Sequence, residues 1–311
     1  MTSVPDRKRI MKILLTGATG YIGSQLKERL LQDEDVRLRL FVRNASKVKL
    51  EVSRNVEMRE GSTFDKDSLL KALKGMDVAY YLIHSMGAKG DFEELDRISA
   101  ENFRDACIAA GVKRIIYLGG LGKKETASKH LLSRIETGEI LSRQPADIQT
   151  IWFRAGIIIG AGSASFRIIR SLIRKLPLMI TPRWVHTKTQ PIAVQDVLQY
   201  LFLAREVEVQ GNLMVDVGSE QMSFKEMLER AARVMGLRRL LIPVPVLSPR
   251  LSSYWLILFS PVSYRIARAL VDGLKSETII QNDNARFYFP KVIPLPYEKA
   301  IEAALSEDEA K

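Results

Sequence analysis

The sequence predicts an α/β protein with a Rossmann-like, doubly wound parallel sheet and a smaller C-terminal lobe. Three observations predict this class. Short apolar runs alternate with helical patterns in the first half of the chain, and a glycine-rich turn joins the first run to the first helix. The alternation loosens after about residue 157, and prolines cluster beyond residue 240. Strands that alternate with helices favour right-handed βαβ crossovers, and therefore a parallel sheet covered on both faces.

The predicted elements follow one another closely. Residues 11–17 form an apolar run that ends at a glycine, as a buried parallel strand does. Residues 21–32 place apolar side chains at helical spacing, and residues 36–42 alternate like a strand. The same reasoning predicts further strands at 55–61, 77–83, 112–120 and 148–156, and further helices at 65–75, 91–111 and 128–141.

The charge balance is basic, which bears on partners. The 311 residues include 47 Lys and Arg against 36 Asp and Glu, a net charge of +11, which favours acidic partners such as phosphates or anionic lipid. Residues 165–177 would place Arg167, Arg170 and Arg174 on one helix stripe. That stripe is either a solvated face or a contact for an anionic substrate tail, a lipid headgroup or an acidic protein. We expect no nucleic acid, because the stripe is short and no aromatic–basic interleave accompanies it.

Other features limit the class of protein. Cys107 is the only cysteine, so an internal disulfide framework and a Cys-based metal cluster are excluded, and we expect no metal site. No run reaches the ~18–20 apolar residues of a membrane span. The uncharged stretch 251–264 would be either a buried helix or a surface that touches lipid or a partner. We expect a cytoplasmic protein, with peripheral attachment to a membrane as the alternative.

The glycine-rich turn carries the strongest motif. The segment "TGATGYIG" places Gly17, Gly20 and Gly23 between a strand and a helix. Gly17 would permit the tight turn, Gly20 would let the backbone approach a pyrophosphate, and Gly23 would let helix and strand pack closely. The helix N-terminus would offer free N–H groups to the phosphates. Because strand, turn and helix are in register, the motif predicts a dinucleotide site.

The end of the second strand indicates which nicotinamide dinucleotide is bound. NAD-selective folds place an acidic residue there, whereas this chain has Arg43, with Lys47 nearby. A guanidinium can hold a 2′-phosphate that a carboxylate would repel. We therefore predict that NADP(H) is preferred over NAD(H). We interpret residues 1–10 as a disordered lead, 11–160 as the NAD(P)-binding Rossmann-like domain, and 161–311 as a C-terminal lobe partly interleaved with the sheet.

Five segments in order resemble a known family: "TGATGYIG", "FVRNASK", "AYYLIHSMG", "RIIYLGGLG" and "TQPIAVQDVLQYL". Together they resemble the atypical short-chain dehydrogenase/reductases, in the NmrA-like and complex-I-accessory-subunit-like NAD(P)-binding branch. The resemblance implies a seven-stranded Rossmann-like sheet with the cofactor across the C-terminal ends of the strands. It implies that the pyrophosphate is bound by Gly17, Ala18, Thr19, Gly20, Tyr21, Ile22 and Gly23. It implies that the ribose next to the nicotinamide is bound by Ile83, His84 and Ser85, and the nicotinamide by Ala155, Gly156 and Ile157.

The usual catalytic pair of the wider family is missing. The resemblance implies a Tyr-x-x-x-Lys pair on the helix after the fifth strand, but no tyrosine occurs between Tyr117 and Tyr200. The matching positions hold His130 and Arg134, four residues apart and therefore on one helix face. His130 would act as an acid–base group, bind cofactor or substrate with Arg134, or simply lie on the helix surface; the residues leave these roles open.

Two functions fit this pattern. The first is an NADP(H)-binding oxidoreductase that acts on a carbonyl, quinone or lipid-like substrate. The second is a non-catalytic NADP(H)-binding redox sensor or an assembly or scaffold protein, which the missing tyrosine–lysine pair favours. With either function, residues 165–177 and 251–264 would be the sites of a peripheral membrane or protein contact.

Overall fold

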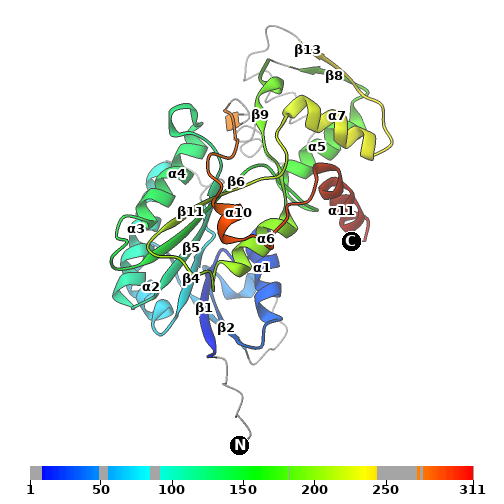
Figure 1. Cartoon of the computed structure of the whole chain (residues 1–311). Coiled ribbons are helices and arrows are strands. Elements are labelled where there is room, and N and C mark those ends of the chain that lie inside the picture. The colour runs from blue at the N-terminus through cyan, green and yellow to red at the C-terminus, as the bar shows by residue number, and fades with distance from the viewer. Residues whose placement is uncertain are drawn as a thin grey trace, which may run out of the picture.

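The computed structural model describes residues 9–48, 55–84, 92–181, 183–243, 272–273 and 276–310. Most of the predicted disordered lead, the uncharged stretch 251–264 and Ser85 lie outside the described residues. Figure 1 shows a sheet with helices on both sides and a separate group of helices and short strands at one end.

The central sheet contains seven described strands, all parallel to their neighbours. Their order across the sheet is β3 (Val56–Glu60), β2 (Val36–Val42), β1 (Met11–Thr16), β4 (Val78–Tyr81), β5 (Arg114–Gly120), β6 (Gln149–Ala155) and β11 (Leu213–Val217). The six predicted strands are confirmed. The resemblance implied a seventh strand without placing it, and the structure shows it as β11, a five-residue strand that follows α6 and a polar loop.

Helices cover both faces of the sheet, which confirms the doubly wound class. One face packs on α1 (Tyr21–Leu31) and α6 (Val194–Leu203), and the other on α2 (Lys66–Leu73), α3 (Phe92–Ala109) and α4 (Lys129–Leu141). Alternate residues of one strand reach opposite cores: in β1, Ile13 and Leu15 join the first and Leu14 the second. Cys107 is fully buried in the second core.

The remaining elements form a lobe with its own hydrophobic core, and short segments connect it to the sheet (Figure 1). Its helices are α5 (Ala164–Lys175), α7 (Phe224–Val234) and α11 (Tyr297–Glu309). Its short strands are β7 (Ile158–Ile159), β8 (Leu178–Thr181), β9 (Lys188–Thr189), β10 (Ile192–Ala193), β12 (Met222–Ser223) and β13 (Leu240–Pro243). Of the other short elements, η3 (Arg183–His186) contacts α7, whereas η1 (Ala45–Lys47) follows β2, η2 (Lys124–Thr126) precedes α4, and α10 (Asn284–Tyr288) packs on β11.

Candidate functional site

The site lies where the sheet order reverses. From β1 the sheet extends through β2 and β3 in one direction and through β4, β5 and β6 in the other. Ligands of such sheets bind beyond the C-terminal ends of the strands at this reversal. The Thr16 hydroxyl donates to the Tyr80 carbonyl at 2.8 Å and accepts from the Leu82 amide at 3.2 Å. These bonds hold the ends of β1 and β4 together beneath the glycine turn.

The glycine turn has the geometry of a phosphate cradle. Gly17 has φ +72°, and a Cβ there would lie 2.4 Å from the Leu82 carbonyl oxygen. A Cβ at Gly23 would lie 2.1 Å from the Gly17 carbonyl oxygen, so only glycine allows α1 to pack this closely on the turn. Gly20 is the N-cap of α1, with no side-chain cap and no acidic residue in the first turn. The first N–H groups of α1 are therefore open to an anion, and the turn fits a pyrophosphate.

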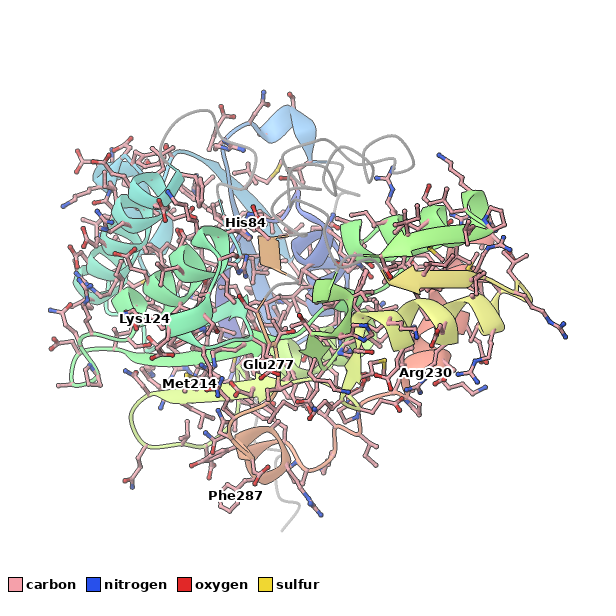
Figure 2. All side chains as sticks on the ribbon, turned by 90° about the horizontal axis from the view of Figure 1, so that it is seen from above. His84, Lys124, Met214, Arg230, Glu277 and Phe287 are labelled. Atoms are coloured by element: carbon pink, nitrogen blue, oxygen red, sulfur yellow. The ribbon has the colours of Figure 1, made fainter. Side chains whose placement is uncertain are left out.

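A cavity of about 390 Å³ extends from this turn toward the lobe. One wall comes from α1, the ends of β4, β5 and β6, and the start of α4; the other comes from α5 and the 187–189 segment. Predicted residues that line the cavity are Gly20, Tyr21, Ile22, Gly23, Ile83, His84, His130, Arg134, Ala155, Gly156 and Ile157. Viewed from above (Figure 2), His84 lies between the sheet-covering helices and the lobe that carries Arg230.

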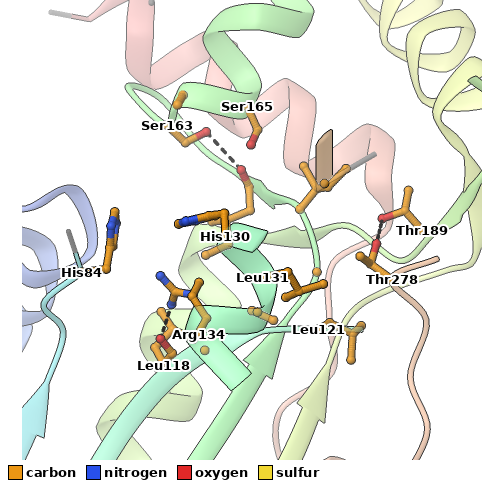
Figure 3. Close-up of a pocket in the computed structure, with 18 of the residues that line it drawn as sticks. His84, Leu118, Leu121, His130, Leu131, Arg134, Ser163, Ser165, Thr189 and Thr278 are labelled. Carbon is orange, nitrogen blue, oxygen red and sulfur yellow. Dashed lines mark hydrogen bonds between the residues drawn. The ribbon is translucent and has the colours of Figure 1, made fainter. Parts of the chain in front are cut away.

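The cavity brings together two histidines and an arginine. The His84 and His130 rings meet edge to face with centroids 6.0 Å apart, and Arg134 lies one helical turn after His130 (Figure 3). Desolvation, with Arg134 as the second cause, lowers the pKa of His130 to about 4. The same causes, with His130 as a third, lower the pKa of His84, which lines the same cavity. Both imidazoles are therefore neutral near pH 7.

Arg134 is held in place by the main chain. Its guanidinium donates to the Leu118 carbonyl, and its own carbonyl accepts from the Tyr117 hydroxyl at 2.9 Å. The end of β5 is glycine because neighbours fill the space of a side chain. A Cβ at Gly119 would lie 2.6 Å from Trp152 Nε1, and one at Gly120 would lie 2.7 Å from Leu131 Cδ1. The indole of Trp152 in β6 thus occupies the space of a side chain at Gly119, and Leu131 of α4 is the neighbour at Gly120.

Several predicted residues lie away from the cavity wall. Gly17, Ala18 and Thr19 form the turn itself, and Arg43 is exposed just after β2. Lys47 belongs to η1.

Gly156 does line the cavity, but packing also requires it to be glycine, because a Cβ there would lie 1.8 Å from the Gln190 carbonyl oxygen.

The lobe contributes residues that the sequence reasoning missed. They include Ser163, Ser165, Ile168 and Ile169 around α5, and Thr189, Phe224 and Thr278. The Thr189 and Thr278 hydroxyls lie 2.6 Å apart (Figure 3). Only Ser163 had a local signal, because a serine before an amphipathic helix is a common N-cap, and its Oγ accepts from the Phe166 amide at 3.2 Å.

The described residues bear on metal binding and on membranes. They contain no group of three or more His, Cys, Asp or Glu side chains placed to hold a metal ion. None of their helices combines the length and the apolar character that crossing a bilayer requires.

Comparison with known proteins agrees with this geometry. Residues 17–144 match the model of a family described as NAD(P)H-binding. An NmrA-like oxidoreductase from Aspergillus flavus is 30% identical over 125 residues, which are 37% of this chain and 35% of that protein, so the chain spans about a third of this relative. A ceramide reductase from Caulobacter vibrioides is 26% identical over 240 residues, 75% of this chain and 73% of that protein.

A solved structure shows the same fold over nearly the whole chain. Triphenylmethane reductase from Citrobacter, in complex with NADP(H), superposes with a TM-score of 0.76 at 19% identity, covering 94% of this chain and 100% of that one. The parallel sheet, the glycine turn at its reversal point and these matches agree with the family that the motifs indicated. Residues 17–144 thus match the NAD(P)H-binding family model, and the seven-stranded parallel sheet has the Rossmann-like fold of the solved structure.

Proposed function

We propose that the protein is an NADP(H)-dependent oxidoreductase that reduces a carbonyl group of an apolar, lipid-like substrate. One observation carries this proposal: a single cavity is lined both by the phosphate cradle and by aliphatic side chains of the lobe, including Ile168 and Ile169. An apolar cavity with few polar groups is what binding a small apolar molecule requires. The similarity to a ceramide reductase supports the lipid-like class.

The residues of the cavity suit a reduction. NADPH, when bound, supplies the hydride. Gly20 and the first turn of α1 would hold its pyrophosphate. Desolvation, aided by Arg134, keeps His130 neutral, and a neutral imidazole N–H can donate a hydrogen bond to a carbonyl oxygen and stabilise the negative charge that builds there. His130 would hold that oxygen by this hydrogen bond as the hydride reaches the carbonyl carbon, and a proton from solvent would complete the alcohol.

We propose that Arg43, assisted by Lys47, selects NADP(H) over NAD(H). β1 and β2 are in parallel register, with Thr16 opposite Phe41, so Arg43 follows β2 at the sheet edge that carries the glycine turn. Its exposed guanidinium is free to meet a 2′-phosphate. The nearby Glu60 carboxylate accepts a hydrogen bond from the Ala45 main-chain amide at 3.1 Å, so it already has a partner in the main chain.

Turnover of a substrate panel tests the oxidoreductase function. We expect the purified protein to consume NADPH with a long-chain ketone at a higher kcat/KM than with a short ketone or a quinone. His130→Gln should lower kcat more than it raises KM. His186→Gln is the matched control, because His186 is exposed and does not line the cavity. NADPH binding without turnover of any carbonyl compound would contradict the proposal.

A second candidate is a nucleotide-binding sensor or assembly protein. Among the described cavity residues the one tyrosine is Tyr21. Its hydroxyl is buried without a hydrogen-bond partner, and burial raises its pKa to about 12, which makes it a poor proton donor. The exchange rate of bound NADPH separates the two functions: exchange within seconds supports turnover, whereas retention over hours supports the second candidate.

A further inference from the structure

The lobe carries an apolar surface that the cavity does not use. β8 and β13 pair in parallel as a two-stranded sheet of their own. Met179 and Leu241 point into the core of the lobe. The alternate residues form an outer face, here called the aliphatic face: Leu178 (47% exposed), Ile180 (47%), Leu240 (61%) and Ile242 (40%). The water-facing side of a sheet is normally polar, so adjacent exposed aliphatic residues mark a contact surface.

Basic side chains border one end of the aliphatic face. β8 starts shortly after Arg174 and Lys175, and β13 starts shortly after Arg238. Because the strands are parallel, with Leu240 opposite Leu178, both starts lie at the same end. These three exposed residues are here called the basic rim. Arg170, one turn earlier on α5, differs because it pairs with Asp308.

The basic rim is fixed next to the strands rather than carried on a loose tail. The Arg239 guanidinium donates to the Ile173 carbonyl, and the Leu240 amide donates to the Pro177 carbonyl at 3.1 Å. These bonds hold the start of β13 against the end of α5. No acidic residue occurs in the sequence between residues 148 and 195, and the acidic residues that act on Arg170 of α5 come from α11.

We propose that the aliphatic face and the basic rim dock the protein on the surface of an anionic lipid bilayer. Aliphatic side chains enter the boundary between headgroups and acyl chains, while guanidinium and ammonium groups pair with lipid phosphates. The positive rim beside the aliphatic face favours an anionic surface over a neutral one as the occupant. The two strands lie at the far end of the lobe from the central sheet (Figure 1), so a flat surface can reach them.

Vesicle cosedimentation of the full chain tests this docking without relying on the cofactor or on turnover. We expect binding to vesicles of equal phosphatidylserine and phosphatidylcholine, little binding to phosphatidylcholine alone, and weaker binding as salt increases. Replacing Arg174, Lys175 and Arg238 together by Gln should weaken binding to the mixed vesicles on the order of 100-fold. Leu178→Thr with Leu240→Thr should weaken it about 10-fold.

Matched controls separate a local surface from the net charge of the protein. Lys66, Lys71 and Lys74 are exposed on and next to α2, which covers the central sheet, and their replacement by Gln removes the same charge. Phe64→Thr with Leu70→Thr is the apolar control, because these side chains are 50% and 39% exposed. We expect both control variants to bind like the unchanged protein. Equal loss in the control and rim variants, or full binding by the Leu178/Leu240 variant, would overturn the proposal.

A labelling experiment reads the contact directly. Cys107 is fully buried, so a thiol introduced by Ile180→Cys is the accessible one among the described residues. An environment-sensitive dye there should shift to the blue on mixed vesicles, whereas a dye on Phe64→Cys should not. No shift at position 180, or a shift in concentrated protein without lipid, would overturn the proposal; the second result would indicate self-association.

Discussion

At the scale of residues, Arg43 and its neighbours decide which dinucleotide fits. We expect Arg43→Ala to raise the dissociation constant for NADPH about 10–100-fold, the loss of a charge-assisted bidentate contact, and to leave NADH unchanged. Isothermal titration with each nucleotide measures this. Arg37→Ala is the control, because Arg37 lies near the other end of β2. An equal loss for both nucleotides would contradict a 2′-phosphate contact.

The pKa of His130 depends on Arg134. Desolvation is the larger cause of its lowering and Arg134 the second. In Arg134→Gln we therefore expect the pKa of His130 to rise from about 4 but to stay below the ordinary value of about 6.5. Titration of the imidazole Hε1 resonance by NMR follows this change. An unchanged pKa would mean that the guanidinium does not act on this ring.

The lowered histidine pKa values also predict how stability depends on pH. Between about pH 6.5 and about 4 the unfolded chain binds protons that His130 in the folded chain does not. The free energy of unfolding should therefore fall as the pH drops through this window. Above the window the contribution of His130 to that free energy is complete. Urea unfolding across this range measures the slope. His84→Gln with His130→Gln should make it shallower; an unchanged slope would show that other groups cause it.

At the scale of elements, the glycines of the turn have different tasks. Gly23→Ala places a Cβ 2.1 Å from a main-chain oxygen, so α1 must move from β1. We expect a loss of about 1–3 kcal/mol in the free energy of unfolding, together with loss of nucleotide binding. Gly20→Ala meets a neighbour only at 3.2 Å, and should weaken binding with a smaller change in stability. Thermal unfolding and nucleotide titration of both variants measure the difference; equal destabilisation would contradict it.

At the scale of the whole molecule, a buried ion pair ties the last strand to the sheet. Asp216 in β11 is fully buried and accepts from Arg154 Nε at 2.6 Å, Arg154 Nη2 at 2.8 Å and the Gln281 amide at 2.8 Å. Asp216→Ala would leave the Arg154 charge buried alone. We expect the free energy of unfolding, measured with urea, to fall by about 3–5 kcal/mol. Arg154→Met combined with Asp216→Leu should recover much of that loss; no recovery would mean that the pair has no such coupling.

The sequence alone determined the sheet domain and its cofactor class. Apolar runs, helical periodicity and Gly17, Gly20 and Gly23 are local signals, because each residue's role depends on neighbours a few positions away. The proposed roles of His130 could not be separated without the tertiary structure. Its periodicity places it on one face of α4, but that face meets a cavity only because Ser163 and Ile168 of α5 lie opposite.

Only the tertiary structure decided where the seventh strand, the lobe wall of the cavity and the aliphatic face lie. Thr189 and Thr278 are far apart in the chain but share a hydrogen bond, and Leu178 pairs with Leu240. No local pattern predicts such contacts, because they form between segments that the packing of the lobe brings together. The same packing sets the desolvation that lowers the pKa of His130, so the chemistry available at α4 follows from the fold as much as from the residue.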